Sequence, residues 1–321
     1  MTGAKGNSKK LALRGANGRI TNSLLFGGLI VLFVLFSLTT NGNFIKMSNL
    51  KALLLQSSLY IIAACGVLFV MSNGNLELSV GGIIGMSAAA GCIMSRLTNP
   101  AMSLVACLAT GILLASVIGG CHILLDVPAF IVGIALMFAS GGIVSYLLNI
   151  FPKLAHKGLE SLNSFWFIIG VTALTYIGFG FILKYTKIGK YNKAIGSNIN
   201  AAHFCGVNVK KYKYLAYLMY GLCCGMCAFL ITVRTGSFSV DTGSGYETEV
   251  LIMLIIGGMP MSGGTSSKVR TPLLGALIYM ILKNGMTLWG VGADVINIIR
   301  VILFFIIVTI TYDRSGMRFI P

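Results

Sequence analysis

The chain has 321 residues, of which 56% are hydrophobic and only 10% are charged. Soluble domains carry about 25% charged residues, so this composition excludes a soluble protein and indicates a polytopic membrane protein. The formal charge of +16 at pH 7 does not indicate a nucleic-acid partner, because Lys and Arg also keep membrane-protein loops in the cytoplasm. We therefore expect membrane lipid, and no nucleic acid, around this chain.

Nearly all of the eight cysteines lie within apolar runs, which argues against a disulfide framework. Cys224 and Cys227 have CxxC spacing, but no second Cys or His pair lies beside them. We interpret these two as small side chains at a helix interface. The three histidines have no metal-ligand spacing either, so we predict no metal site.

The N-terminal segment 1–22 contains five Lys and Arg residues and is predicted to be a disordered cytoplasmic tail. Apolar runs follow, most of them near the ~20 residues that a bilayer requires. No small-residue cleavage site follows the first run, so we treat it as an uncleaved span. The predicted spans are 23–38, 50–71, 76–94, 102–118, 128–150, 164–183, 214–233, a run from 250 that is cut short at 256, 273–288 and 295–310. We predict an all-α membrane helix bundle of about ten transmembrane helices over 23–312, with a cytoplasmic tail at 313–321.

The distribution of positive charge predicts the orientation. With the amino terminus inside and the sides alternating, 16 of the 24 Lys and Arg residues fall inside and 6 outside, while Lys283 and Arg300 lie within spans. Cytoplasmic loops of membrane proteins carry such an excess. Both termini are therefore predicted to be cytoplasmic.

The longest polar interval is 191–213, YNKAIGSNINAAHFCGVNVKKYK, within the larger loop 184–213. A segment this polar does not lie in lipid, yet it has the signals of a folded helix. Ser197 or Asn198 can serve as an N-cap, and Gly206 stands where a helix commonly ends. We predict a short cytoplasmic helix that lies flat under the membrane.

This short helix has the residues of a docking surface. Ala201 and Ala202 would let the surface of another protein come close to the helix backbone, and Phe204 could fill a pocket on that partner. A second interpretation is that 184–213 is a basic loop that only fixes the orientation of the chain.

Three carboxylates, Glu77, Glu247 and Glu249, lie at the mouths of predicted spans. Ionised groups close to hydrocarbon are candidates for a translocation pathway or gate. The alternative is that each occupies the first turn of a helix, where the free N–H groups favour a negative charge. Arg300 lies well inside the tenth run, where it either pairs with one of these glutamates or extends to the membrane surface.

The eighth run ends in GGMPMSGGTSSK, which does not match a phosphate-binding loop because Lys268 follows Ser267 and precedes Val269. The chain shows no Ser/His/Asp or Cys/His set for catalysis. We therefore predict that it is not an enzyme and does not hydrolyse ATP. The run is a candidate helix break whose backbone lines a cavity. Its break residues are Gly257, Gly258, Pro260, Gly263 and Gly264.

The two halves of the chain share a faint pattern. Glu77 comes shortly before Gly81-Gly82, and Glu249 comes before Gly257-Gly258. With the predicted topology the halves would run in opposite directions, which is the inverted repeat of many transporters.

Several long motifs resemble a known family. AIGSNINAAHFCGVNVKKYK, TGSGYETEVLIMLIIGGMPMSGG, LLGALIYMILKNGMTLWGV and a closing YDR occur in that order. They resemble the membrane subunits of bacterial ABC importers for ribose, galactose and related sugars, in the superfamily of branched-chain amino acid permeases. NLELSVGG is similar to an Asp-Leu-Ser-Val-Gly segment of that family, with Glu77 in place of the more usual aspartate. Arg300 stands where the family often has Lys.

The resemblance implies a permease subunit in the bacterial cytoplasmic (inner) membrane that translocates a sugar delivered by an extracytoplasmic binding protein. It also implies a dimer with a second copy or a paralogue, and cytoplasmic ATPases that bind the ATP and Mg. The segment from Asn200 to Gly206 resembles the coupling helix that docks on such an ATPase. Branched-chain amino acids and nucleosides are alternative substrates. Two alternatives from other classes are an ion-coupled secondary transporter that uses Glu77, Glu249 and Arg300, and a structural membrane scaffold.

Overall fold

A computed structural model describes residues 25–151 and 158–311 of the chain, and over these ranges it contains helices and no β-strand. The predicted tails, 1–22 and 313–321, lie outside the described residues. The helices are Leu25–Thr39, α2 (Met47–Ser72), α3 (Val80–Leu97), α4 (Pro100–Leu124), α5 (Ala129–Ile150), η1 (Glu160–Leu162), α6 (Phe165–Tyr185), α7 (Lys187–Ser197), α8 (Ile199–Phe204), α9 (Val209–Thr235), α10 (Tyr246–Ile256), η2 (Gly264–Ser266), α11 (Arg270–Leu288) and α12 (Ala293–Thr311).

Each predicted span corresponds to one of these helices, so the polytopic helical bundle is confirmed. The count of about ten is not confirmed, because within residues 25–151 and 158–311 six helices are both long and apolar enough to cross a membrane: α2, α3, α4, α5, α6 and α9. α10 has 11 residues, which span about 16 Å at 1.5 Å per residue. That is about half the thickness of a bilayer core.

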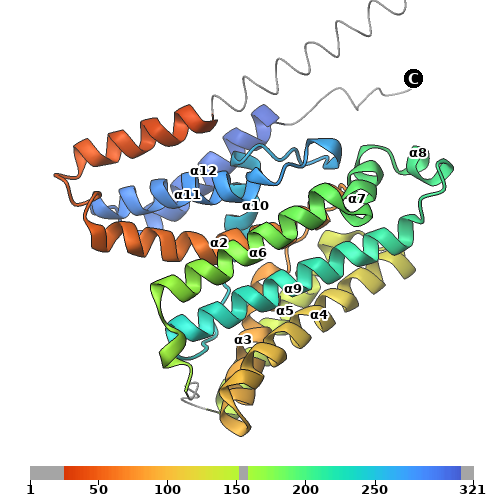
Figure 1. The fold of residues 1–321 in the computed structure, drawn as a ribbon, viewed down its shortest axis with the longest axis horizontal. Helices are drawn as coiled ribbons and strands as arrows, with labels where there is room; N and C mark the ends of the chain where they lie inside the picture. Colours follow the sequence, from red (N-terminus) through yellow and green to blue (C-terminus); the bar gives the residue numbers. More distant parts are fainter. Residues whose placement is uncertain (1–24, 152–157, 312–321) are drawn as a thin grey trace, which may run out of the picture.

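The centre of the bundle is α9, which packs against α2, α3 and α4 (Figure 1). Small residues allow this close packing. At Gly221 of α9, an added Cβ would overlap the carbonyl oxygen of Gly111 on α4. Small side chains let membrane helices approach closely where no hydrophobic driving force exists between them. Cys224 and Cys227 are fully buried on α9 with free thiols, as the interpretation of small interface residues predicts.

The outer helices present apolar side chains to the surroundings. Less than a fifth of the most apolar stretch of α5, and of α6, is buried within the chain. Their exposed residues include Phe138, Tyr146, Trp166 and Leu174. A soluble monomer rarely exposes this much apolar surface, so these faces suit contact with lipid or with another membrane protein.

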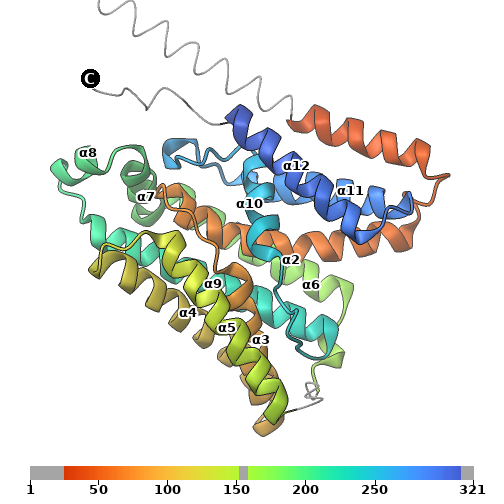
Figure 2. The ribbon, with the colours of Figure 1, turned by 180° about the vertical axis from the view of Figure 1, so that it is seen from behind.

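Two irregular segments run into the interior of the bundle, so that α3 and α10 each begin inside the bundle. Residues 73–79 run back from the end of α2 to the start of α3 (orange in Figure 2), and residues 236–245 precede α10. The segment 236–245 meets the first turn of α3, where an added Cβ on Gly243, at φ +89°, would overlap the carbonyl oxygen of Gly81. Irregular backbone at membrane depth is tolerated where protein or water covers it.

This geometry corrects the proposed correspondence between the two halves. Gly81 and Gly82 lie in the first turn of α3, whereas Gly257 and Gly258 follow the last turn of α10. The two glycine pairs are therefore not equivalent, and that part of the predicted repeat is wrong. The order of a carboxylate followed by a glycine pair does not reveal which end of a helix the pair occupies.

Candidate functional site

A buried ionic cluster joins α10, α11 and α12. Glu249 Oε1 accepts from Lys283 Nζ at 2.8 Å and from Arg300 Nη1 at 2.6 Å. Glu249 lies in the first turn of α10 and is 5% exposed. The structure thus contains the pair between Arg300 and a glutamate that was one of the two alternatives for Arg300. Breaking a buried pair leaves an uncompensated charge, so the three helices are tied to one another.

Aromatic rings border this cluster. Tyr60 on α2 stacks on Tyr246 on α10 with ring centroids 4.3 Å apart, and Lys283 Nζ lies 5.9 Å from the centre of the Tyr60 ring. Glu249 Oε2 has no hydrogen-bond partner among the described residues. Because Oε2 is buried, a further donor such as a hydroxyl group or water reaches it only if the helices around the cluster separate.

Glu77 lies in the irregular segment 73–79, three residues before α3 begins, and not in a first helical turn as one interpretation predicted. It is fully buried. Its Oε1 accepts from the backbone N–H of Ser79 at 3.0 Å, while Ser79 Oγ hydrogen-bonds Tyr220 Oη on α9 at 3.0 Å. On the opposite side, Gly133 of α5 leaves room for the carboxyl, because an added Cβ would overlap Oε1. Glu77 thus fixes the start of α3 between α5 and α9.

A small cavity of about 170 Å³ lies where α3, α5 and the segment 240–247 meet. Its walls are glycines of α3 and polar groups that include Ser140, Thr242, Ser244 and Glu247. Glu247 Oε1 accepts from the N–H of Gly245 at 3.2 Å, in the first turn of α10. At ~30 Å³ per water molecule, the cavity has room for about five waters or for part of a small polar solute.

The predicted short helix is present as α8. Asn198 Oδ1 accepts from the N–H of Ala201 at 3.0 Å, so Asn198 is the N-cap. Gly206 follows the helix at φ +78°. Asn200 and Ala201 are exposed, and Phe204 is 87% exposed. An aromatic side chain presented in this way is available to a partner.

Ala202 does not belong to the exposed face of α8. It is 5% exposed, and its carbonyl accepts from the N–H of Val207 at 3.1 Å. The prediction that Ala202 would let a partner approach is therefore wrong. The helix is too short for a periodic pattern to reveal which alanine faces its own chain.

α7 connects α8 to the bundle. Asn192 Nδ2 donates to the carbonyl of Phe69 at 3.2 Å, near the end of α2. The N–H of Thr265 donates to Ser197 Oγ at 3.1 Å, in the turn between α10 and α11. Through these two hydrogen bonds, a displacement of α8 would reach both α2 and the α10–α11 turn. Partial burial also lowers the pKa of Lys193, which lies on α7.

That turn is the candidate helix break. Gly257 caps α10, and Gly258, Gly263 and Gly264 have positive φ. α10 ends at Ile256, and the run that follows, which also contains Pro260, is not α-helical until α11 begins at Arg270. An added Cβ on Gly263 would overlap the Met71 carbonyl, so the turn packs closely against the end of α2. A role of its backbone in lining a cavity stays a prediction.

Comparison with known proteins assigns the family. Residues 49–309 match the model for the permease component of branched-chain amino acid transport systems. The chain belongs to this permease family.

Curated relatives of the permease span most of its length. The ribose import permease protein RbsC of Escherichia coli is 29% identical over 302 residues, which cover 89% of this chain and 93% of the relative. RbsC of Bacillus subtilis is 28% identical over 305 residues, or 91% and 92% of the two chains. The L-arabinose transport system permease protein AraH of Escherichia coli is 29% identical over 314 residues, or 94% and 93%. No solved structure matches significantly.

Sequence reasoning missed one member of the permease's ionic cluster. Lys283 was recognised as a charge within a span but not as a partner of Glu249. The signal was present, because the rule that singled out Arg300, a charge in an apolar run, applies equally to Lys283. Glu249 and Arg300 meet in the structure, whereas Glu247 lies at the small cavity and Glu77 at the start of α3.

Proposed function

We propose that this chain is the membrane-spanning permease subunit of an ABC importer, and that it translocates a monosaccharide. The family membership supports the role of permease subunit, and the relatives named for ribose and arabinose support a monosaccharide over a branched-chain amino acid. The single observation that carries the importer proposal is α8, a capped helix that presents Phe204 and is joined through α7 to α2 and to the α10–α11 turn.

In this proposal a partner ATPase binds ATP and Mg and docks on α8. Asn200, Ala201, Phe204 and Gly206 form the docking face. Closure of the ATPase pushes α8, and α7 passes the displacement to the ends of α2 and α10. The chain itself supplies no ATP hydrolysis. A second permease copy or a paralogue completes the assembly in the bacterial inner membrane, with both termini in the cytoplasm.

An extracytoplasmic binding protein delivers the sugar at the other end of the bundle. The small polar cavity at Glu247 and the ionic cluster of Glu249, Lys283 and Arg300 are the candidate pathway and gate. Hydroxyl groups of a sugar match the unpartnered oxygen of Glu249 and the polar wall of the cavity. The gate operates if the Glu249 pairs differ between the inward-open and outward-open states, since a coupled switch requires different contacts in each.

The docking proposal is tested by affinity purification of the tagged chain from its native membrane in mild detergent, with mass spectrometry of the bound proteins. We expect an ABC ATPase in the wild-type sample and its loss in a Phe204→Glu variant. A Lys211→Gln variant is the control, because Lys211 is exposed nearby but lies outside the docking face. Recovery of the ATPase with Phe204→Glu at wild-type level would refute docking at this face.

A further inference from the structure

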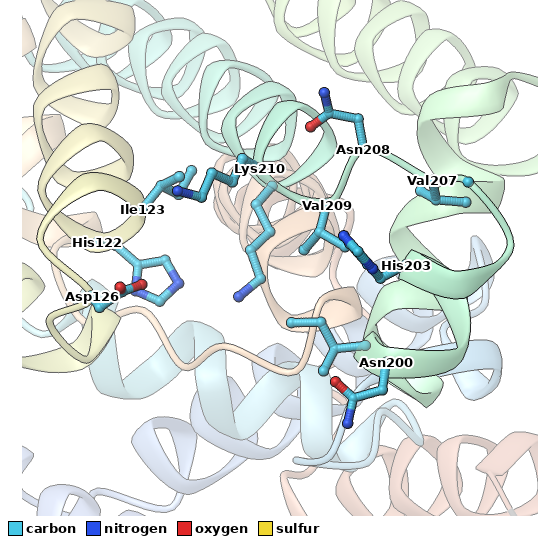
Figure 3. Close-up of a pocket in the computed structure, with 12 residues that line it drawn as sticks. His122, Ile123, Asp126, Asn200, His203, Val207, Asn208, Val209 and Lys210 are labelled. Atoms are coloured by element: carbon cyan, nitrogen blue, oxygen red, sulfur yellow. The ribbon is translucent and has the colours of Figure 1, made fainter.

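A cavity of about 610 Å³ lies beside α8. It is bounded by the end of α4, the 125–128 corner, α8 and the first turns of α9. Figure 3 shows His122 and Asp126 on one side, Asn200 and His203 on the other, and Lys210 between them. Asn200 and Gly206 of the docking face line one side of this cavity, whereas Phe204 does not, and the opposite side belongs to α4, the 125–128 corner and α9.

The cavity is lined by two lysines and one carboxylate, so positive charge is in excess. Lys210 and Lys213 both line it, and neither forms an ion pair among the described residues. Lys213 is only partly exposed. Asp126 lines the same cavity without forming a salt bridge to either lysine. Two ammonium groups beside one carboxylate leave this partly enclosed space with an excess of positive charge, which favours an anionic ligand.

His122 shapes the wall of the cavity but adds no charge to it. Its Nδ1 lies 2.8 Å from the carbonyl of Val127, which can only accept, so Nδ1 carries the proton. Its Nε2 lies 3.0 Å from Asn75 Nδ2 and accepts from that amide. Both ring nitrogens are therefore occupied, and the positive potential of the cavity comes from the lysines. The bond to Asn75 also connects the cavity wall to the irregular segment 73–79.

The rim of the cavity is apolar. Leu124 and Leu125 lie between the lining residues Ile123 and Asp126 and are 77% and 68% exposed. Ile199, at the start of α8, lines the cavity and is also exposed. A ligand that places an anionic group between the lysines would meet hydrocarbon at the edge. A phospholipid has this combination, whereas free phosphate has no apolar part.

From this arrangement we infer that the cavity binds the phosphate group of an anionic phospholipid, and that the bound lipid braces α8 against α4 and α9. The inference rests on the proposed function, because that function puts α8 on the cytoplasmic side. The cytoplasmic leaflet is rich in anionic lipid, and basic pockets between helices on that side bind such headgroups.

The test measures lipid retention by the full-length chain alone, purified in detergent, and so does not depend on the ATPase. Phosphatidylglycerol is added against a phosphatidylcholine background, and the retained lipid is measured by native mass spectrometry. We expect the Lys210→Gln/Lys213→Gln variant to bind phosphatidylglycerol about thirtyfold more weakly, which corresponds to about 2 kcal/mol at ~1 kcal/mol per lysine.

Two control variants make the result specific. Lys211→Gln removes a neighbouring exposed charge that does not line the cavity, and it is expected to bind within about twofold of wild type. Lys210→Arg/Lys213→Arg retains the charges and is expected to retain the lipid. Equal binding by wild type and the Gln double variant would overturn the inference.

Two further arms separate the alternative occupants. Inorganic phosphate that displaces the lipid at comparable concentration would identify a free-phosphate site and overturn the lipid assignment. Loss of ATPase co-purification in the Gln double variant, with phosphatidylglycerol retention unchanged, would assign the lysines to the protein interface instead. A wild-type chain that binds no ATPase but retains lipid through the lysines would refute the proposed function and leave the lipid site standing.

Discussion

Glu249→Gln is expected to destabilise the helix bundle because it removes the negative charge that two cations share. Lys283 and Arg300 both contact Oε1, at 2.8 and 2.6 Å, so their charged nitrogens lie within about 5.4 Å of each other. Two unit charges ~5 Å apart repel by about 3 kcal/mol at an effective dielectric constant of ~20. The Lys283 side chain is 36% exposed, and solvent screening reduces this repulsion. Glu249 offsets this repulsion in the wild type, so we expect the loss of its two attractions to have a net cost of about 3 kcal/mol.

The measurement is the free energy of unfolding in bicelles, with Glu247→Gln as the matched control. Glu247 lies on the same helix and makes a hydrogen bond to Gly245 but no ion pair among the described residues, so its loss is expected to cost about 1 kcal/mol or less. Adding Lys283→Met to Glu249→Gln is expected to recover about half of the loss, because it removes the repulsion. Equal costs for the two Gln variants, or no recovery, would refute the argument.

Three further predictions follow from single contacts. Asn198→Ala removes the α8 N-cap at a cost of about 1 kcal/mol. The amount of ATPase that co-purifies is therefore expected to fall about fivefold at an unchanged permease level, and an unchanged amount of ATPase would contradict this prediction. Gly133→Ala is expected to lower the melting temperature, because the added Cβ overlaps Glu77 Oε1. Adding Glu77→Asp, which shortens that side chain, is expected to restore the melting temperature. Gly243→Ala combines φ +89° with overlap at Gly81 and is expected to cost about 3 kcal/mol or more, seen as loss of monodisperse protein on size-exclusion chromatography.

The sequence predicts best those features that depend on neighbouring residues. The α8 helix was predictable because Asn198 and Gly206 are local start and stop signals. The apolar runs predicted the positions of the helices because a bilayer demands long hydrophobic segments. Both signals are read from a few adjacent residues and need no knowledge of tertiary contacts.

Features that depend on helix rotation or on chain reversal were not predictable in this way. The burial of Ala202 depends on how α8 packs on its own chain. The partnership of Lys283 with Glu249 depends on which faces of α10 and α11 meet. The third predicted span began at 76, whereas α3 begins at Val80, because hydrophobicity does not distinguish a buried extended segment from a helix. Glu77 was for that reason assigned to a helical turn that does not exist.

ATP-driven uptake by the reconstituted complex tests the central proposal most directly. The permease, its ATPase and its binding protein are placed in liposomes, and the entry of radiolabelled ribose, arabinose or galactose is measured with and without ATP. We expect uptake of at least one of these sugars to require ATP and to be lost in Phe204→Glu but not in Lys211→Gln. Uptake by the permease alone under an ion gradient, without ATP, would contradict the importer mechanism and favour secondary transport.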